Sequence, residues 1–258
     1  YFLILYLGIE LLSLSLYSII AFNKKSVLSS EAAVKYFILG TIASGFLLFG
    51  ISLIYGITGS LFFNEINQFI ASSLQDRATL DIYNVGFIFS LTFILASLAF
   101  KFGAAPFHMW IPDVYHGSLT PTTLLLSTLP KLAVFIVLIK LFVEAFPGLI
   151  NFWGDMIKIL AIISILIGNL IAIAQTNIKR MLAYSTIANV GFILIAFSLG
   201  TKEAYQATLF YTISYIIMTI AIFGLISLIV KDKNAIEEIN DLKGLNEYHP
   251  WIAFLIMI

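Results

Sequence analysis

The chain has 258 residues, of which 60% are hydrophobic and only 11% charged, and its formal net charge is +0. This balance excludes a nucleic-acid-binding protein and a strongly basic membrane-surface protein, because both need an excess of Lys and Arg. The absence of cysteine excludes disulfides and thiolate-bound iron–sulfur clusters, and three scattered histidines leave no spacing typical of a Cys/His metal site. We therefore expect no cofactor and no metal in this chain.

Apolar runs near the ~20 residues that cross a bilayer as a helix recur along almost the whole chain. The sequence therefore predicts an all-α, polytopic transmembrane helical bundle that forms a single domain over 1–258. The chain begins inside an apolar run without an initiator Met and ends in another, so we expect a part of a longer or split subunit. The predicted spans are 1–22, 31–55, 84–110, 121–146, 155–175, 184–200 and 204–230, with the start of a further span at 251–258.

Basic residues are distributed unevenly between the predicted loops. The opposite-side loops hold little beyond Arg77 and Lys202. Because Lys-rich loops stay on the cytoplasmic or matrix side, the loops after the first, fifth and seventh spans are expected on that side. These loops contain Lys24, Lys25, Lys179, Arg180, Lys231, Lys233 and Lys243.

Two segments have patterns that indicate packing. In the second span, small residues that let neighbouring backbones approach recur at Gly40, Ser44, Gly45 and Gly50. In the loop after that span, apolar residues recur at a helical spacing, which predicts an amphipathic helix that acts as a lid or brace. These loop residues are Phe63, Ile66, Ile70 and Leu74.

Ionisable residues Glu10, Lys101 and Lys131 lie inside long apolar stretches. A charge at the bilayer centre costs roughly 2.5–3.5 kcal/mol even on the lenient insertion scale, so such residues typically mark ion or proton pathways. The alternative is a structural ion pair with Glu10, although buried pairs rarely stabilise more than apolar packing does. Lys35 and Lys140 lie nearer to span ends, where a lysine can extend to the headgroups.

The third span carries Gly103 and Pro106 shortly after Lys101. Because Pro106 lacks an N–H and clashes with the carbonyl of Phe102, the sequence predicts a discontinuous helix near Gly103–Pro106. A break exposes carbonyls inside the apolar layer, which is tolerable only where protein or water takes up their hydrogen bonds. Transporters use this arrangement to place ions near the midplane of the bilayer.

Three residues after the predicted break have structural interpretations. Trp110 is expected to anchor the chain at the membrane interface, because an indole has one apolar and one polar side. Asp113 is expected to cap or brace a turn. Thr120 is expected to cap the fourth span, with Pro121 at the first helical position, where proline loses no internal hydrogen bond.

The stretch from Lys101 to Lys131, KFGAAPFHMWIPDVYHGSLTPTTLLLSTLPK, closely resembles the family of chain 2 of respiratory complex I, the proton-pumping NADH:ubiquinone oxidoreductase. The bacterial counterpart in that family is subunit N. Further segments agree in order and spacing: YLGIELLSLSLYSIIAF from Tyr6, SEAAVKYFILGTIASGFLLFGISLIYG from Ser30 and QTNIKRMLAYSTIANVGF from Gln175. The resemblance implies an antiporter-like fold of two inverted five-helix repeats, each with a discontinuous helix.

By this resemblance, Glu10 matches the acidic residue of the fifth family helix. Lys35, Lys101 and Lys131 match the lysines of the sixth, seventh and eighth. The resemblance thus implies that these residues transfer protons, driven by quinone reduction elsewhere in the complex. It also implies that NADH, FMN, iron–sulfur clusters and ubiquinone bind to other subunits. The expected partners are other membrane-arm subunits, membrane lipids and, for a split subunit, a second chain with the missing helices.

Two alternatives to this function stay open. A cation/proton antiporter subunit shares the architecture, although PFHMWIPDVYHG and Lys35 favour the respiratory subunit. A non-conducting structural membrane subunit is the other alternative. Heavy use of Phe, Ile, Leu, Tyr, Lys and Asn without Cys favours the mitochondrial inner membrane over a bacterial cytoplasmic membrane.

Overall fold

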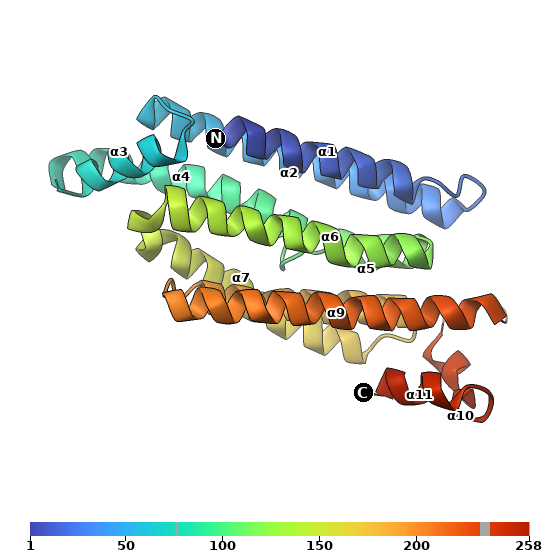
Figure 1. Cartoon of the computed structure of the whole chain (residues 1–258). Coiled ribbons are helices and arrows are strands. Elements are labelled where there is room, and N and C mark those ends of the chain that lie inside the picture. Colours follow the sequence, from blue (N-terminus) through green and yellow to red (C-terminus); the bar gives the residue numbers. More distant parts are fainter. Residues whose placement is uncertain (76, 233–237, 258) are drawn as a thin grey trace.

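Long helices run side by side along one direction in the computed structural model, which describes residues 1–75, 77–232 and 238–257 (Figure 1). Of the basic residues counted above, Lys233 lies outside these ranges. The membrane-sized helices are α1 (Phe2–Ile20), α2 (Val27–Thr58), α4 (Arg77–Phe102), α6 (Thr120–Leu138), α7 (Ile150–Ile173), α8 (Ile178–Phe197) and α9 (Lys202–Asp232). The shorter elements are α3 (Phe63–Gln75), α5 (Trp110–Gly117), η1 (Ile139–Ala145), η2 (Pro147–Leu149), η3 (Ile239–Leu242), α10 (Leu245–Tyr248) and α11 (Pro250–Met257).

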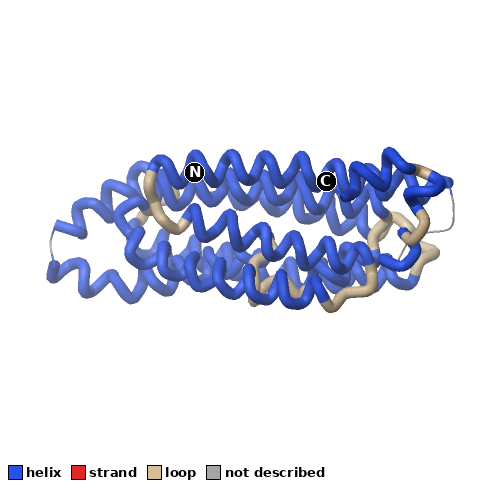
Figure 2. Tube along the Cα trace, turned by 90° about the horizontal axis from the view of Figure 1, so that it is seen from below, coloured by secondary structure: helices blue, strands red, loops and turns tan. Residues whose placement is uncertain are grey.

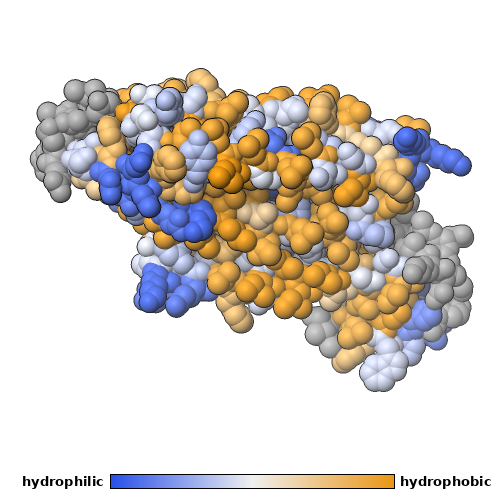
Figure 3. All heavy atoms as spheres, turned by 45° about the horizontal axis from the view of Figure 1, so that its top comes forward, coloured by the Kyte–Doolittle hydropathy of each residue, from blue (hydrophilic) through white to orange (hydrophobic). Residues whose placement is uncertain are grey.

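The surface of the bundle is that of a membrane protein. Seven helices of the described part are long and apolar enough to cross a bilayer. In the space-filling view, apolar side chains cover the middle of the visible face and hydrophilic ones gather towards its ends (Figure 3). The chain is therefore an all-α, multi-pass membrane protein.

Several helices begin before the predicted spans do. α8 begins at Ile178 rather than at 184, because the side chain of Asn177 accepts a hydrogen bond from the Arg180 N–H and caps it. Lys179 and Arg180 therefore lie in its first turn and not in a loop. α2 likewise begins at Val27 rather than at 31, after a cap by Ser26. Charged or polar residues end an apolar run, but a helix extends until its terminal N–H groups find a cap.

The third predicted span, 84–110, consists of two helices. α4 ends at Phe102, and Trp110 begins the separate helix α5. The connection at 103–109 lies part-way along the bundle, whereas most other loops lie at its ends (Figure 2). The discontinuity therefore occurs where Gly103 and Pro106 predict it.

The start of α6 differs from the prediction by one residue. Leu119 is the N-cap, and Thr120 is the first helical residue, so Thr120 is not the cap. The Leu119 carbonyl accepts a hydrogen bond from the Thr123 N–H at 2.9 Å. α6 continues through Pro130 and passes directly into the π-helical turn η1. The fourth membrane span thus reaches from Thr120 to Ala145.

The amphipathic loop segment forms α3, which packs against η1, η2 and α4. Its residues Ile66 and Ile70 are fully buried and belong to the larger apolar core. Figure 1 shows α3 at the end of the bundle that is opposite to α5. This helix is a brace that ties η1 and η2 to the rest of the bundle.

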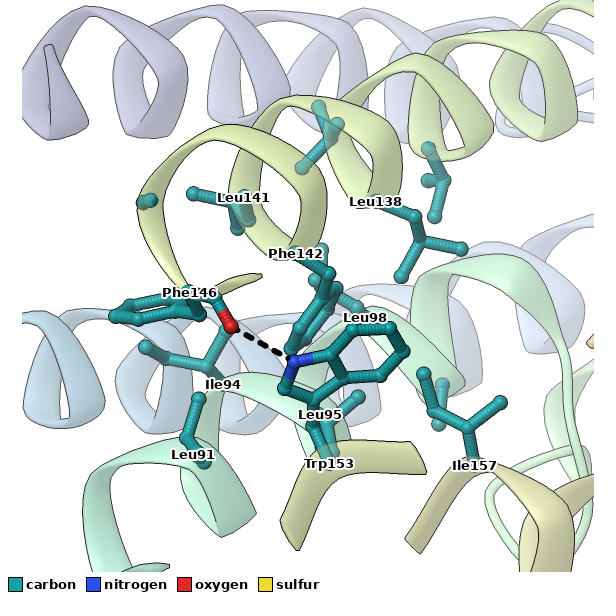
Figure 4. Close-up of a cluster of buried hydrophobic side chains, with 14 of the residues drawn as sticks. Leu91, Ile94, Leu95, Leu98, Leu138, Leu141, Phe142, Phe146, Trp153 and Ile157 are labelled. Carbon is teal, nitrogen blue, oxygen red and sulfur yellow. Dashed lines mark hydrogen bonds between the residues drawn. The ribbon is translucent and has the colours of Figure 1, made fainter. Parts of the chain in front are cut away.

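An apolar cluster formed by α4, α6, η1 and α7 fills this half of the bundle (Figure 4). The indole N–H of Trp153 donates a 2.9 Å hydrogen bond to the carbonyl of Phe146, just after the last turn of η1. Trp153 is fully buried, and its ring lies 5.1 Å from that of Phe142 and 5.8 Å from that of Phe197. Trp153 therefore fills the cluster and also satisfies a carbonyl where the helical hydrogen bonding ends.

Replacing Trp153 by Ala should lower the free energy of unfolding by about 3 kcal/mol or more, because it leaves a large cavity and an unpaired carbonyl. Trp153→Phe should lose less, since it keeps most of the ring. Thermal unfolding of the purified protein in detergent measures both. Leu170→Ala is the control, because Leu170 is 69% exposed; an equal loss in that variant would contradict the assignment.

Candidate functional site

A buried ion pair joins α1 to the last turn of α4. The ammonium of Lys101, which is 6% exposed, lies 3.0 Å from Oε1 of Glu10. It also donates to Oγ of Ser13 at 2.9 Å and to Oγ of Ser44 at 3.3 Å. Ser44 in turn donates to the same Glu10 oxygen at 2.6 Å. Both charges are therefore compensated inside the protein, as buried charges require.

Side chains from distant segments satisfy the backbone at the break after Phe102. The ammonium of Lys131 donates to the Phe102 carbonyl, and the indole N–H of Trp110 donates to the Phe100 carbonyl at 2.9 Å. On the other side of the break, the Ala105 N–H donates to Oγ of Ser164 at 2.8 Å. Groups on α5, α6 and α7 thus supply hydrogen bonds where α4 is interrupted.

Gly103 makes the approach of Lys131 possible. Its φ of +84° lies in the left-handed region, which a residue with a side chain rarely adopts. A Cβ atom at this position would also lie 2.8 Å from Nζ of Lys131. Glycine is therefore needed both for the turn of the chain and for the space that the ammonium occupies.

Lys131 is 1% exposed and has a different environment from Lys101. Its ammonium lies 5.4 Å from the ring centroid of Trp110 and 6.0 Å from that of Phe102, close enough for cation–π attraction. No carboxylate of the described residues forms an ion pair with it. The ammonium groups of both lysines therefore lie at the C-terminal end of α4. That of Lys101 pairs with a carboxylate, whereas that of Lys131 contacts a carbonyl and aromatic rings.

The interfacial position expected for Trp110 is wrong. Trp110 is 1% exposed, and its ring stacks on that of Tyr36 at 4.4 Å with an angle of 25°. The chain turns back into helix α5 inside the bundle, where the indole N–H finds a carbonyl of the interrupted helix. The polar side of this residue thus bonds to backbone rather than to headgroups.

Lys35 lies in a second charged cluster and not with the other predicted residues. Its ammonium is 2.7 Å from Glu31 and 2.9 Å from Asp113, and the side chain is 43% exposed. Asp113 also pairs with Arg180 of α8 at 2.9 Å. This carboxylate braces α5 between α2 and α8, a wider role than the capping of one turn.

Two cavities adjoin these clusters. One, of about 160 Å³, lies at the Lys35 cluster and is lined by Leu28, Glu31, Ala32, Lys35, Asp113, His116, Gly117 and Arg180. The other, of about 150 Å³, reaches Lys101 between α1, α2 and α6 and is largely apolar apart from Ser13, Tyr36 and Lys101. Both exceed the ~15 Å³ that a single water needs. Each cavity is therefore large enough to hold water, and the second one borders the paired lysine.

Sequence reasoning missed the hydroxyls of this site. Ser13 follows Glu10 by three residues, a spacing that places both on one helix face and could have indicated it. The sequence pattern indicates only a packing role for Ser44, because a serine in a stripe of small residues is usually structural. Nothing in the sequence pattern indicates Ser164, since its partner Ala105 becomes accessible only through the break.

A helix broken part-way along a membrane bundle is an arrangement that many transporters share. The family described as NADH:quinone oxidoreductase/Mrp antiporter, transmembrane, matches residues 2–258. The chain belongs to this family.

Individual relatives agree with this assignment. NADH-quinone oxidoreductase subunit N of Thioalkalivibrio sulfidiphilus (strain HL-EbGR7) is 52% identical over 100% of this chain and 52% of its own length. A chain of respiratory complex I from Thermus thermophilus with bound aureothin has a TM-score of 0.78 at 32% identity, over 98% of this chain and 52% of that one. A chain of the Mrp complex from Dietzia sp. DQ12-45-1b has a TM-score of 0.84 at 21% identity, over 98% of this chain and 45% of that one, which shows the shared fold. The chain spans about half the length of the curated relatives it matches.

The Asp113 bridge should make stability depend on pH. Burial raises the pKa of the Asp113 carboxyl, but the hydrogen bonds from Lys35 and Arg180 outweigh burial and leave the pKa below its ordinary value. The stabilisation is therefore present above the unfolded value of about 3.9 and is lost as the pH falls through the lower folded value. Asp113→Asn should lower the thermal midpoint at pH 7, with a difference from the wild type that shrinks towards pH 3.

Thermal unfolding in detergent between pH 7 and pH 3 measures this difference. Asp155→Asn is the matched control, because Asp155 is 71% exposed and pairs with Lys158 of its own helix. A difference that stays constant over this pH range would show that Asp113 does not act through its charge.

Proposed function

We propose that the chain translocates protons as an antiporter-like membrane subunit of an NADH–quinone oxidoreductase. The observation that carries the proposal is the Glu10–Lys101 ion pair, 3.0 Å long, beside a helix break whose terminal carbonyl binds Lys131. The names of the curated relatives and the likeness to a respiratory complex I chain support the type of complex.

The ion pair acts as the switch in this proposal. When Glu10 is close, it favours the charged form of Lys101; when it moves away, burial favours the neutral amine. The ammonium then releases its proton from Nζ. A change of about 1.4 kcal/mol in the interaction energy alters the proton occupancy tenfold, so a small displacement of α1 against α4 is sufficient.

Lys131 is the proposed acceptor of that proton. The cavity that reaches Lys101 is also lined by Pro130, which directly precedes Lys131 on α6. Water in this cavity would carry the proton to a neutral Lys131. Lys35 and the polar cavity at its end of the bundle are the proposed entrance from the Lys-rich side.

The setting of the subunit follows from the same relatives. We propose that NADH, FMN, iron–sulfur clusters and ubiquinone bind to other subunits, and that membrane-arm subunits and lipids surround this chain. The relatives are bacterial, which favours a bacterial cytoplasmic membrane over the mitochondrial inner membrane. Composition alone favours the mitochondrial inner membrane, so the relatives and the composition point to different membranes.

A cation/proton antiporter subunit is the second candidate function, because the matched family and the shared fold include Mrp antiporters. Sodium-dependent proton exchange without NADH oxidation would favour it. A non-conducting structural subunit would instead keep the fold but show no dependence of pumping on the buried lysines.

Replacing Lys101 or Lys131 by Ala in the assembled complex should lower NADH-driven proton pumping by about tenfold or more, because a proton-transfer group is removed. Coupled NADH oxidation should fall with it. Acidification of inverted membrane vesicles and NADH consumption give the two readouts. Lys140→Ala is the control, since Lys140 is 52% exposed and pairs with Glu144 of its own helix. Normal pumping in both test variants would reject the proposal.

Glu10→Gln should keep the shape of the pair but remove its charge, so that Lys101 loses the partner that favours its protonated form. Proton pumping and NADH turnover should fall together, with normal assembly of the complex. Wild-type values in this variant would show that the pair is structural.

A further inference from the structure

Two hydroxyl groups lie within the Glu10–Lys101 pair, on different helices. Ser13 of α1 and Ser44 of α2 are 4% and 6% exposed. Ser44 contacts both charges, since it donates to Glu10 at 2.6 Å and accepts from Lys101 at 3.3 Å. Ser13 accepts from Lys101 at 2.9 Å and makes no hydrogen bond to the carboxylate.

Each hydroxyl also has a backbone acceptor in its own helix. Ser44 is 3.0 Å from the Gly40 carbonyl, and Ser13 is 2.9 Å from the Ile9 carbonyl. Serines in membrane helices often make this internal bond alone, as Ser90 of α4 does with the Phe87 carbonyl. A hydroxyl has a single proton, so Ser44 can donate either to Glu10 or to Gly40 but not to both.

We propose that Ser44 and Ser13 are positioning residues that hold the pair in its closed, doubly charged form, and that Ser44 turns its hydroxyl from Glu10 to the Gly40 carbonyl when the pair opens. This inference rests on the proposed function. The turn leaves the hydroxyl proton bonded while the carboxylate moves away. Opening therefore does not leave the buried Ser44 donor without a partner, a loss that would otherwise oppose it.

The two serines contact different members of the ion pair and therefore have different roles. The Ser44 hydroxyl stabilises the carboxylate as a donor and the ammonium as an acceptor. The hydroxyl proton of Ser13 already bonds to the Ile9 carbonyl, so the Ser13 oxygen acts only as an acceptor for the Lys101 ammonium. Removing Ser44 should thus disfavour both charges, whereas removing Ser13 should disfavour only that of Lys101.

Other ionisable groups near the pair are few among the described residues. Tyr36 of α2 lines the same cavity as Lys101, and the ring of Tyr17 of α1 lies 4.9 Å from that of Tyr36. Tyr6 lies one turn before Glu10 on α1, and Lys131 of α6 bonds to the residue after Lys101. α7 contributes the uncharged Ser164 at the break. Tyrosines are ordinarily neutral up to about pH 10, so below that value the pH profile of pumping reports on the ion pair and on Lys131 rather than on the tyrosines.

The test is the pH profile of NADH-driven proton pumping by the assembled complex in membrane vesicles. Ser44→Ala should narrow the active range from both sides, each limb moving inward by about one pH unit. Ser13→Ala should move only the alkaline limb, by a similar amount. Ser44→Thr keeps the hydroxyl and should restore the wild-type profile. Ser90→Ala is the buried control and should leave both limbs in place.

The inference would be overturned if Ser44→Ala, Ser13→Ala and Ser90→Ala gave identical pH profiles of pumping. This holds whether all three profiles are shifted from that of the wild type or none is. Its failure is distinguishable from failure of the proposed function. Loss of pumping in Lys101→Ala with unshifted serine profiles would reject only the role of the serines. Normal pumping in Lys101→Ala would reject the proton route itself.

Discussion

The structure depends on one constraint of the bilayer: a backbone carbonyl or N–H that leaves its helix must find another partner, because the hydrocarbon offers none. At the break between Phe102 and Ala105, several backbone groups that need such partners lie close together. Groups of three other elements supply these partners, through Trp110, Lys131 and Ser164. Their convergence fixes the end of α4 against α5, α6 and α7.

The same constraint explains why a lysine can both complete the fold and titrate. A neutral amine keeps N–H donors, so Lys131 can lose a proton and still bond to the Phe102 carbonyl. An arginine at this position could not give up its proton in a protein. Lys101 differs, because its partners are a carboxylate and two hydroxyls whose contacts depend on its charge. The end of α4 thus brings together the amines of Lys101 and Lys131, whose proton affinities depend on different partners.

Much of this arrangement is predictable from local chemistry. Gly103 and Pro106 mark the discontinuity, because glycine permits a left-handed backbone and proline removes an N–H donor wherever they occur. The depth of Glu10, Lys101 and Lys131 in apolar runs marks them as unusual without knowledge of their neighbours. The errors arose where a partner decides the role. The sequence predicts Trp110 at the interface, whereas its indole bonds to the Phe100 carbonyl inside the bundle. The sequence also groups Lys35 with Lys101, whereas Asp113 and Glu31 hold Lys35 in another cluster.

By itself, the sequence determined the membrane environment, the helical class, the place of the break and the identity of the buried charges, since these depend on composition and on residues near in the chain. Only the tertiary structure decided which groups meet. Ser44 reaches Glu10 across 34 positions, and Lys131 reaches Phe102 across 29. Such contacts depend on how the helices rotate and stack against one another, and hydrophobic patterning specifies that only weakly in lipid, where most faces of a helix are apolar.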